Sequence, residues 1–464
     1  MIVAREAEYL PGPAGLLRAA GQGRLPVLFH SGLGSGSWSR WSIFATDPCD
    51  VFREDSGAAD SFERLGRFLE ARRIAPGSEP WPEAAEWPFV GGAAGFLAYE
   101  LGAVLEKKLP APRRDRLRLP RARLGFYNAA YLADHHKRQG WVAGHSVPGA
   151  PPVGEALERL EALIAAAGRA ASSGPAAEPD PPADWAGRFE AEVSRADYER
   201  GVERILDYIF AGDIYQANYT FRLSRPFSRG GIDLFEAAAR LNPAPYSAYL
   251  AAEEFEIVSS SPELFLQVEG RKALTRPIKG TIARSADPAE DARRARRLRA
   301  NPKDMAENIM IVDLERNDLG KVCEFGSVRA DRLLEIESFP NVHHLVSTVE
   351  GRLRQGQGAL EAFTALFPGG SVTGAPKIRA MQIIHELEPV ARHVYCGAIG
   401  FFDSRGGARF NLPIRTIAVA QGRAWFNVGG GIVADSRPDS EYEECMDKGW
   451  GLARTILSLE AQED

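Results

Sequence analysis

The amino-acid sequence predicts an α+β fold with a mostly antiparallel β-sheet. Two observations carry this prediction. Runs rich in β-branched and aromatic residues follow one another with Gly and Pro turns between them. Segments of helical periodicity interrupt these runs in groups, rather than alternating with every strand as in a parallel sheet. With 464 residues, 45% of them hydrophobic, the chain can bury a large core over two or three domains.

Residues 1–170 are predicted to form a first, β-rich unit. Apolar and aromatic runs bounded by turns predict strands at 26–31, 41–48 and 123–135. Leu157, Leu160 and Ile164 recur at helical spacing and predict an amphipathic helix that closes the unit. Residues 171–186 hold four prolines, and Trp185 is their only large apolar side chain, so we expect a linker at 171–187.

Residues 188–464 are predicted to form the second unit, in which groups of strands are separated by helices. Apolar residues at helical spacing predict a helix that ends near Gly212. The run at 254–270 predicts a hairpin with its turn at Ser261 and Pro262. Further helices are expected at 288–300, 303–314, 359–367, 376–387 and 439–457, and further strands at 214–224, 271–284, 396–403, 408–420 and 423–433.

Composition and charge exclude several classes of protein. Lys+Arg 56 against Asp+Glu 62 leaves a net charge of −6, which gives no basic field for nucleic acid or an anionic membrane. The four cysteines lie far apart without metal-ligand spacing, as in a reduced compartment. The N-terminus lacks the basic and then apolar run of a signal peptide. We therefore expect a cytoplasmic protein with no nucleic-acid and no membrane partner.

Two pairs of carboxylates are the first candidates for chemistry. Asp304 and Glu307 are three residues apart on one predicted helix, and Glu441 and Glu444 are three apart on another. Residues at this spacing share a helix face. If the two faces meet, their oxygen-only ligands suit Mg²⁺. For any single pair, a solvated helix face is the commoner explanation.

Two glycine-rich segments offer backbone N–H groups to an anion. At 368–376, Thr373 and Gly374 precede a proline that begins a predicted helix, and helix N-termini bind carboxylates and phosphates. At 428–436, Gly429 and Gly430 belong to a run of three glycines that lets backbone approach a ligand closely. The first segment could equally be a capped helix after a turn.

Lys279 stands out because lysine is rare in this chain, which has nine lysines and 47 arginines among its 56 basic residues. It lies in a small-residue and apolar setting within RPIKGT. A nucleophilic lysine must be neutral, and at pH 7 an ordinary lysine is neutral in only about one molecule in two thousand. Burial could lower its pKa enough. A surface lysine or salt-bridge partner is the alternative.

His343 and His344 are neighbours in a predicted strand. Because side chains alternate along a strand, we expect one imidazole to face the interior and the other to face away. A buried histidine is more often structural than catalytic, so the residues alone leave the role of His344 open.

With these motifs identified, the sequence resembles the chorismate-utilising enzymes over about residues 190–455. Nine segments occur in the family's order: IYQANYT, SSSPELFL, RPIKGT, KDMAENIMIVDLERNDLG, NVHHLVS, FPGGSVTGAPKIRAMQIIHELEP, YCGAIGFF, LPIRT and VGGGIVADSRPDSEYEECMDKG. The resemblance implies two mostly antiparallel sheets packed face to face, with helices on the outside. It also implies an enzyme that acts on chorismate.

Site residues are carried over from the resemblance position by position. Glu307 and Glu444 resemble the Mg²⁺ ligands, with Asp304 and Glu441 nearby through water, and the metal is expected to hold the ring carboxylate of chorismate. Lys448 is expected to offset the crowded acids. Glu263 resembles the general acid beside the departing 4-hydroxyl, and His344 the histidine next to the ring. The other residues expected to bind or line the substrate are Gln216, Thr281, Thr373, Gly374, Tyr395, Arg415, Gly429 and Gly430.

Two positions indicate the branch of the family. Members that add water to chorismate carry a lysine base where this chain has Gln216. Anthranilate synthases carry alanine where this chain has Lys279. The resemblance is therefore to the aminodeoxychorismate branch, in which that lysine attacks ring C2 and ammonia enters at C4, giving 4-amino-4-deoxychorismate for para-aminobenzoate and folate synthesis. Anthranilate synthase component I, of the tryptophan pathway, is the alternative activity.

The resemblance also implies a partner. None of the four cysteines lies in the G-x-C-x-G setting of a glutaminase, so ammonia is expected from a separate glutamine amidotransferase subunit, in a heterodimer. A non-catalytic chorismate-binding partner of a glutaminase is the remaining alternative, but all four acidic positions are filled in this chain.

Overall fold

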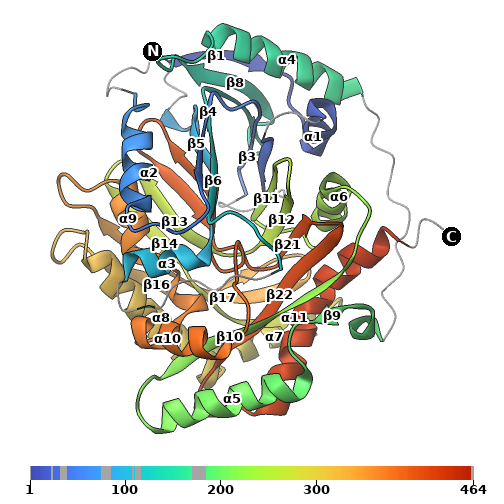
Figure 1. Ribbon diagram of the computed structural model, residues 1–464, viewed down its shortest axis with the longest axis vertical. Helices are drawn as coiled ribbons and strands as arrows, with labels where there is room; N and C mark the ends of the chain where they lie inside the picture. Colours follow the sequence, from blue (N-terminus) through green and yellow to red (C-terminus); the bar gives the residue numbers. More distant parts are fainter. Residues whose placement is uncertain are drawn as a thin grey trace.

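A computed structural model describes residues 2–21, 25–31, 39–74, 85–106, 109, 116–169 and 184–460. Two β-sheets pack face to face at its centre, and helices cover their outer sides (Figure 1). Every strand pair recorded in both sheets is antiparallel. The predicted α+β class, with two mostly antiparallel sheets and helices outside, is confirmed.

The first sheet has 12 strands. Both faces of this sheet are largely buried, because one face packs against the second sheet and the other packs against helices. In spatial order its strands are β1 (Ile2–Ala7), β8 (Gln139–His145), β7 (Ala129–Asp134), β3 (Trp41–Ala45), β2 (Val27–His30), β11 (Tyr246–Ala251), β12 (Glu256–Ser261), β21 (Thr416–Ala420), β22 (Arg423–Ile432), β10 (Gln216–Pro226) and β18 (Gly374–Ala375), with β9 (Glu190–Ala191) beside β10.

The second sheet has 10 strands. In spatial order they are β15 (Ile278–Ala283), β17 (Val342–Arg352), β14 (Lys272–Arg276), β13 (Leu264–Glu269), β20 (Ala408–Asn411), β19 (Ala398–Asp403), β5 (Gly92–Leu97), β6 (Ala122–Tyr127) and β4 (Asp50–Glu54), with β16 (Arg329–Ser338) beside β17. Pro277 separates β14 from β15, and both strands pair with β17.

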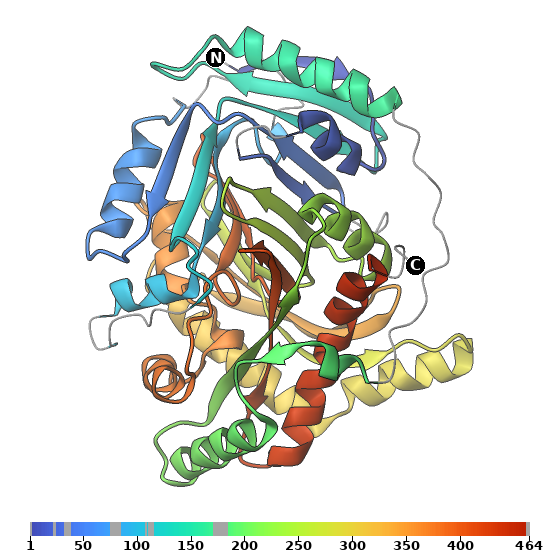
Figure 2. The same cartoon turned by 45° about the vertical axis from the view of Figure 1, so that its right-hand side comes forward.

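The helices divide between the outer faces of the two sheets. Over the first sheet lie α1 (Ala14–Ala20), α4 (Val153–Arg169), α5 (Arg195–Phe210), α6 (Gly231–Leu241), α10 (Lys377–Leu387) and α11 (Pro438–Ser458). With the second sheet pack α2 (Ser61–Glu70), α3 (Gly102–Leu105), α8 (Pro302–Gly320) and α9 (Ala359–Leu366), and α7 (Pro288–Arg299) lies against β15 and β17. Short 3₁₀ turns are η2 (Tyr99–Leu101), η3 (Trp185–Arg188) and η4 (Gly370–Val372). Helices α5 and α11 run beside each other at the end of the molecule opposite α4 (Figure 2).

The core between the sheets joins segments far apart in the sequence. Phe96 on β5 meets Phe255 with ring centroids 5.6 Å apart, and Phe29 on β2 meets Phe401 on β19 at the same separation. Such edge-to-face aromatic contacts add to the burial of apolar surface. Both sheets contain strands from before and after the predicted linker, so neither sheet divides at 171–187; residues 171–183 lie outside the described residues.

The hairpin predicted at 254–270 is wrong. Its two halves are β12 and β13, which belong to different sheets. The chain passes between the sheets at 262–263, where Ser261 Oγ donates to the Leu412 carbonyl at 2.6 Å and Leu412 N donates to the Glu263 carbonyl at 3.0 Å. Two apolar strands joined by a Ser-Pro turn can form either a hairpin in one sheet or a crossing between two sheets. Pairing with strands distant in the sequence decides which of the two forms. This crossing places Glu263 next to the site.

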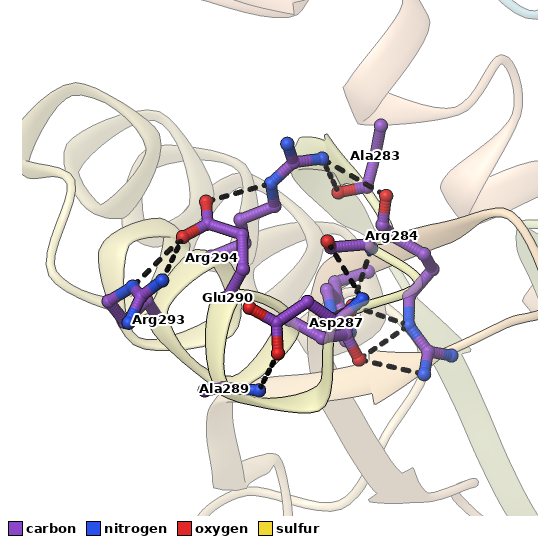
Figure 3. A network of polar contacts seen from close by, with 10 residues as sticks. Ala283, Arg284, Asp287, Ala289, Glu290, Arg293 and Arg294 are labelled. Atoms are coloured by element: carbon purple, nitrogen blue, oxygen red, sulfur yellow. Dashed lines mark hydrogen bonds and ion pairs between the residues drawn. The ribbon is translucent and has the colours of Figure 1, made fainter.

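A polar network fixes the end of β15 to α7 (Figure 3). Asp287 caps α7 by accepting from Ala289 N at 3.0 Å, and Asp291 accepts from Arg284 Nε at 2.9 Å and from Ser285 N. The Arg284 guanidinium holds the pKa of Asp291 well below its usual range. These bonds anchor the end of the strand that carries Lys279.

The described helices include none long and apolar enough to cross a lipid bilayer.

Candidate active site

The candidate site lies where β15, the start of β10, the turn at η4 and the helices α8 and α11 approach one another. Lys279 Nζ, on β15, donates to the Ser371 carbonyl of η4 at 3.3 Å. On the other side, Gly431 of β22 brings its backbone up to the same place, because a Cβ there would lie 2.2 Å from Gln216 Nε2 and 3.4 Å from Lys279 Nζ. Gln216 Oε1 is buried without a hydrogen-bond partner among the described residues. A ligand group placed here could satisfy it.

Lys279 sits in an environment that favours its neutral form. Burial lowers the pKa of Lys279, and the carboxylates of Glu307 and Glu263 oppose this effect only in part. Lys448 is a second cation nearby and lowers the pKa further. A lysine with a lowered pKa has more of the free amine that nucleophilic attack requires.

Glu263 combines burial with a short hydrogen bond. Its side chain is 4% exposed, and Ser371 Oγ donates to Glu263 Oε1 at 2.6 Å. Burial raises the pKa of Glu263 to about 7, although the Ser371 hydroxyl and the charge of Lys279 favour ionisation. A carboxyl group with this pKa can hold a proton near neutral pH and give it up, as a general acid must. Ser371 thus contacts both Lys279 and Glu263.

The two predicted carboxylate pairs lie on α8 and α11, whose acids influence each other. Burial raises the pKa of Glu307, and the charge of Glu444 adds to the increase. The pKa of Asp304 is raised by burial and by Glu444. Glu444 is paired with Lys448 at 2.7 Å, which lowers the pKa of this carboxyl. Glu441 accepts from Ser436 Oγ at 2.6 Å. The helices therefore bring the predicted acids into one electrostatic neighbourhood.

The donor set fits Mg²⁺ bound through few protein ligands. Among the described residues, no three His, Cys, Asp or Glu side chains converge closely enough to form a complete cage. Mg²⁺ commonly uses one or two carboxylates, waters and substrate oxygens instead. Glu307 and Glu444 lie on two helices and influence each other electrostatically: the pKa of Glu307 is raised, and Lys448 compensates the charge of Glu444. A divalent cation could stabilise these carboxylates.

The glycine-rich segments shape the site through close backbone contacts. Gly374 has φ of +156°, and a Cβ there would lie 2.1 Å from the Gln216 carbonyl, so only glycine fits this pairing of β18 with β10. Thr373, fully buried, donates from Oγ1 to the Gly369 carbonyl at 2.9 Å, and its own carbonyl accepts from Asn218 N at 2.7 Å. The Thr373 N–H is also used inside the turn, in a 3.2 Å bond to Gly370.

The second glycine run lies against α11. Lys448 Nζ donates to the Gly429 carbonyl at 3.1 Å, and a Cβ on Gly430 would lie 3.1 Å from Glu441 Oε2. Burial opposes the charge of Lys448, but the carboxylate of Glu444 outweighs it and raises the pKa of this lysine. The predicted role of Lys448 in offsetting the acids agrees with these contacts.

His344, Thr281 and Arg415 form another part of the site. Thr281 Oγ1 and His344 Nδ1 are 2.8 Å apart, and burial together with the charge of Arg415 lowers the pKa of His344 to about 3, so this imidazole is neutral at physiological pH. Burial lowers the pKa of Arg415, whose guanidinium has no ion pair among the described residues. An arginine in this state favours an incoming carboxylate. Tyr395 is buried, and this burial raises the pKa of its hydroxyl.

The expectation that one of the two neighbouring histidines faces away from the interior is wrong, because both are buried. His343 is 3% and His344 2% exposed, because α7 and β16 cover the side of β17 that was expected to face solvent. His343 Nε2 lies 3.0 Å from Asp291 Oδ1 and its Nδ1 lies 2.8 Å from Ser338 Oγ. Its role is therefore to hold α7 and β16 together.

Sequence reasoning overlooked two buried polar residues near the site. Ser371 lies inside the glycine-rich segment, but its contact with Glu263 bridges 108 residues, which no local pattern indicates. Glu315 lies on α8 and is 4% exposed. Its position four residues after Ile311 and four before Leu319, on the apolar face of the helix, is the signal that could have revealed it.

Comparisons with known proteins agree with the family that the sequence motifs indicate. A sequence model of the chorismate binding enzyme family matches residues 29–454. The chain is 38% identical over 448 residues to aminodeoxychorismate synthase component 1 of Klebsiella aerogenes, covering 94% of each protein. It is 39% identical over 434 residues to anthranilate synthase component 1 of Thermus thermophilus, covering 92% of this chain and 91% of that protein.

Solved structures agree. Anthranilate synthase component I from Streptococcus pneumoniae superposes with a TM-score of 0.77 at 28% identity, covering 90% of this chain and 93% of that one. MenF, the menaquinone-specific isochorismate synthase of Escherichia coli, has the same fold, with a TM-score of 0.74 at 16% identity and coverage of 98% and 94%. The resemblance noted from the sequence motifs is confirmed, and the chain is an enzyme that belongs to the chorismate binding enzyme family.

Proposed function

We propose that this enzyme aminates chorismate at C4 with ammonia, giving 4-amino-4-deoxychorismate. The observation that carries the proposal is the pair formed by Lys279 and Glu263 around Ser371. A lysine whose pKa burial lowers stands beside a carboxyl whose pKa burial raises to about 7. This combination supplies a nucleophile and a proton donor together.

The proposed reaction has two displacements. The free amine of Lys279 attacks ring C2, both ring double bonds shift toward C4, and the 4-hydroxyl leaves as water with a proton from Glu263. Ammonia then attacks C4, both double bonds shift back, the bond between C2 and the lysine nitrogen breaks, and the new ammonium group at C4 returns a proton to Glu263. The sum is chorismate plus ammonia giving the 4-amino product and water, and Lys279 is regenerated. Neutral His344 next to the ring would offer hydrogen bonds without adding charge.

The anionic groups of chorismate match the charges of the site. Arg415, together with Tyr395 and the backbone of Gly429 and Gly430, would hold the enolpyruvyl carboxylate. Glu307 and Glu444 would hold Mg²⁺, which when bound supplies positive charge for the ring carboxylate, with Asp304 and Glu441 nearby through water. Gln216, Thr281, Thr373 and Gly374 would line the substrate. Lys448, which pairs with Glu444, would stabilise these acids with or without bound Mg²⁺.

The proposal includes a partner subunit, a cellular location and a biosynthetic pathway. Ammonia would come from a separate glutamine amidotransferase subunit, in the cytoplasm, and the product would serve para-aminobenzoate and folate synthesis. The relatives named component 1 support a partner, since that name belongs to one part of a larger synthase.

Anthranilate synthase activity is the second candidate. The 39% identity to the Thermus thermophilus enzyme favours it as strongly as the 38% identity to the Klebsiella aerogenes enzyme favours C4 amination. The two activities differ in the ring position that receives nitrogen, and in whether a lysine adduct forms.

The test combines purified protein, chorismate, MgCl₂ and an ammonium salt. We expect 4-amino-4-deoxychorismate by NMR and mass spectrometry, and an adduct at Lys279 when ammonia is omitted. Lys279→Ala should lose activity by about a thousandfold or more, as expected for a covalent nucleophile. Lys272→Ala, at an exposed lysine paired with Glu350, is the matched control and should remain active. Fluorescent 2-aminobenzoate as the product, without an adduct, would establish the second candidate instead.

A further inference from the structure

A second carboxyl group is buried behind the site, at Glu315. Helix α8 carries it on the buried face that also bears Ile311 and Leu319, two turns beyond Glu307 along the helix. Its side chain is 4% exposed, and Thr275 Oγ1 donates to Glu315 Oε2 at 2.9 Å. Among the described residues this is the single recorded side-chain hydrogen bond of Glu315. One hydroxyl is a weak counterpart for a buried carboxylate.

Glu315 packs directly under the turn that serves Glu263. A Cβ on Gly370 would lie 3.4 Å from Glu315 Cγ, so η4 rests on this side chain. The next residue of that turn, Ser371, donates to Glu263 at 2.6 Å. The two carboxyl groups therefore approach neighbouring residues of the same turn, Glu315 from α8 and Glu263 from the crossing between the sheets.

Two buried carboxyl groups that approach consecutive residues of one turn resist double ionisation. The pKa of Glu315 is raised to about 8, first by burial and then by the charge of Glu263. Burial raises the pKa of Glu263 to about 7. The charged groups that face the pair are Lys279 against Glu263, and Lys377 and Asp318 against Glu315; Lys377 is itself paired with Asp318.

We propose that Glu315 is a positioning residue that shares a proton with Glu263. This sharing keeps a fraction of the general acid Glu263 protonated at and above neutral pH. Once one proton has left the pair, the remaining proton divides between the two carboxyl groups. Glu263 then keeps a usable protonated fraction over a wider pH range than a lone carboxyl would. Exchange would pass through Ser371 or water, with no net change in protons. This inference rests on the proposed amination, because it assigns Glu263 the task of protonating the leaving hydroxyl.

The test is the pH profile of kcat/KM for Glu315→Gln, which keeps shape but cannot share a proton. In the parent enzyme, activity should fall on the alkaline side in two steps. In the variant it should fall in one step at lower pH, so that kcat/KM drops about tenfold at pH 8.5 and changes less than twofold at pH 6; a tenfold change corresponds to one pH unit. Glu315→Asp, which restores a carboxyl group, should recover part of the two-step profile.

Controls separate this role from a structural one. Asp313→Asn removes an exposed acid from the same helix and should leave the profile unchanged. A pH-difference infrared spectrum of Glu315→Gln should lack one protonated-carboxyl band, a readout that needs no substrate. An identical alkaline limb in Glu315→Gln and parent, in an enzyme that does aminate chorismate, overturns the inference. A parent enzyme that forms no C4-amine overturns the proposed function instead, while the infrared result still tests the shared proton.

Discussion

At the scale of single residues, Ser371 links the two groups proposed to react. Its carbonyl accepts from Lys279 Nζ at 3.3 Å and its hydroxyl donates to Glu263 Oε1 at 2.6 Å. A hydrogen bond donated to a carboxylate stabilises the ionised form. Ser371 therefore opposes the effect of burial on the pKa of Glu263, and in our proposal Glu315 acts in the same direction as burial. The proton affinity of Glu263 is set by these opposing neighbours.

Ser371→Ala should raise the pKa of Glu263 above its value of about 7, because the mutation removes the donor that favours ionisation. The alkaline limb of kcat/KM should move to higher pH by about one unit, opposite in direction to Glu315→Gln. Loss of the bond should reduce the free energy of unfolding by about 1–3 kcal/mol. The pH profile and urea unfolding measure both effects, and Ser327→Ala, in the loop between α8 and β16, is the control. A limb that moves to lower pH would contradict the assignment.

At the scale of elements, strand crossings and short pairings place the site residues. The passage from β12 to β13 carries Glu263 from one sheet to the other. The two-residue strand β18 pairs with β10 and brings Gly374 against Gln216. The anchoring of α7 holds the end of β15, which carries Lys279 and Thr281. Each contact joins elements distant in sequence.

Gly374→Ala should disturb both stability and the site, because the added Cβ would lie 2.1 Å from the Gln216 carbonyl and the φ of +156° disfavours a side chain. We expect a loss of about 2 kcal/mol or more in the free energy of unfolding, with a raised KM for chorismate as β10 shifts. Gly154→Ala on α4 has open space around it and should be neutral or slightly stabilising. Equal stability of the two variants would show that β18 tolerates a side chain.

At the scale of the whole molecule, the two sheets form one cooperative structure. Each sheet joins one block of strands from before the predicted linker to one block from after it, and the core between the sheets joins both parts of the chain. Separating the two parts would expose the unpaired edges of β2, β5, β11 and β19. The predicted boundary therefore divides the sequence into two parts, but each sheet contains strands from both parts.

Phe96→Ala should test this cooperativity, since Phe96 is fully buried and contacts Phe255 across the sheets. We expect the free energy of unfolding to fall by about 3–5 kcal/mol. Calorimetry should show one transition, moved as a whole to lower temperature. Phe325→Ala, at a fully exposed phenylalanine, should leave the transition unchanged. Two separated transitions would show instead that the parts unfold independently.

Local patterns in the sequence were sufficient for the fold class, for most helices and strands, and for the family. The sequence placed both ends of α11 and the start of α8 within one residue, although α8 runs six residues past its predicted end. It thereby gave the spacing of Asp304, Glu307, Glu441 and Glu444. These properties depend on neighbouring residues, so a single sequence expresses them. The ordered motifs likewise lie along the chain itself.

Only the tertiary structure decided how these elements meet. The hairpin expected at 254–270 became a crossing between sheets, and both histidines of β17 became buried. The shifts in the pKa values of Lys279, Glu263 and Glu315 arise from desolvation by segments up to about a hundred residues away in the chain, which no local pattern encodes. The scarcity of lysine singled out Lys279, and burial against η4 gave it an environment suited to a nucleophile.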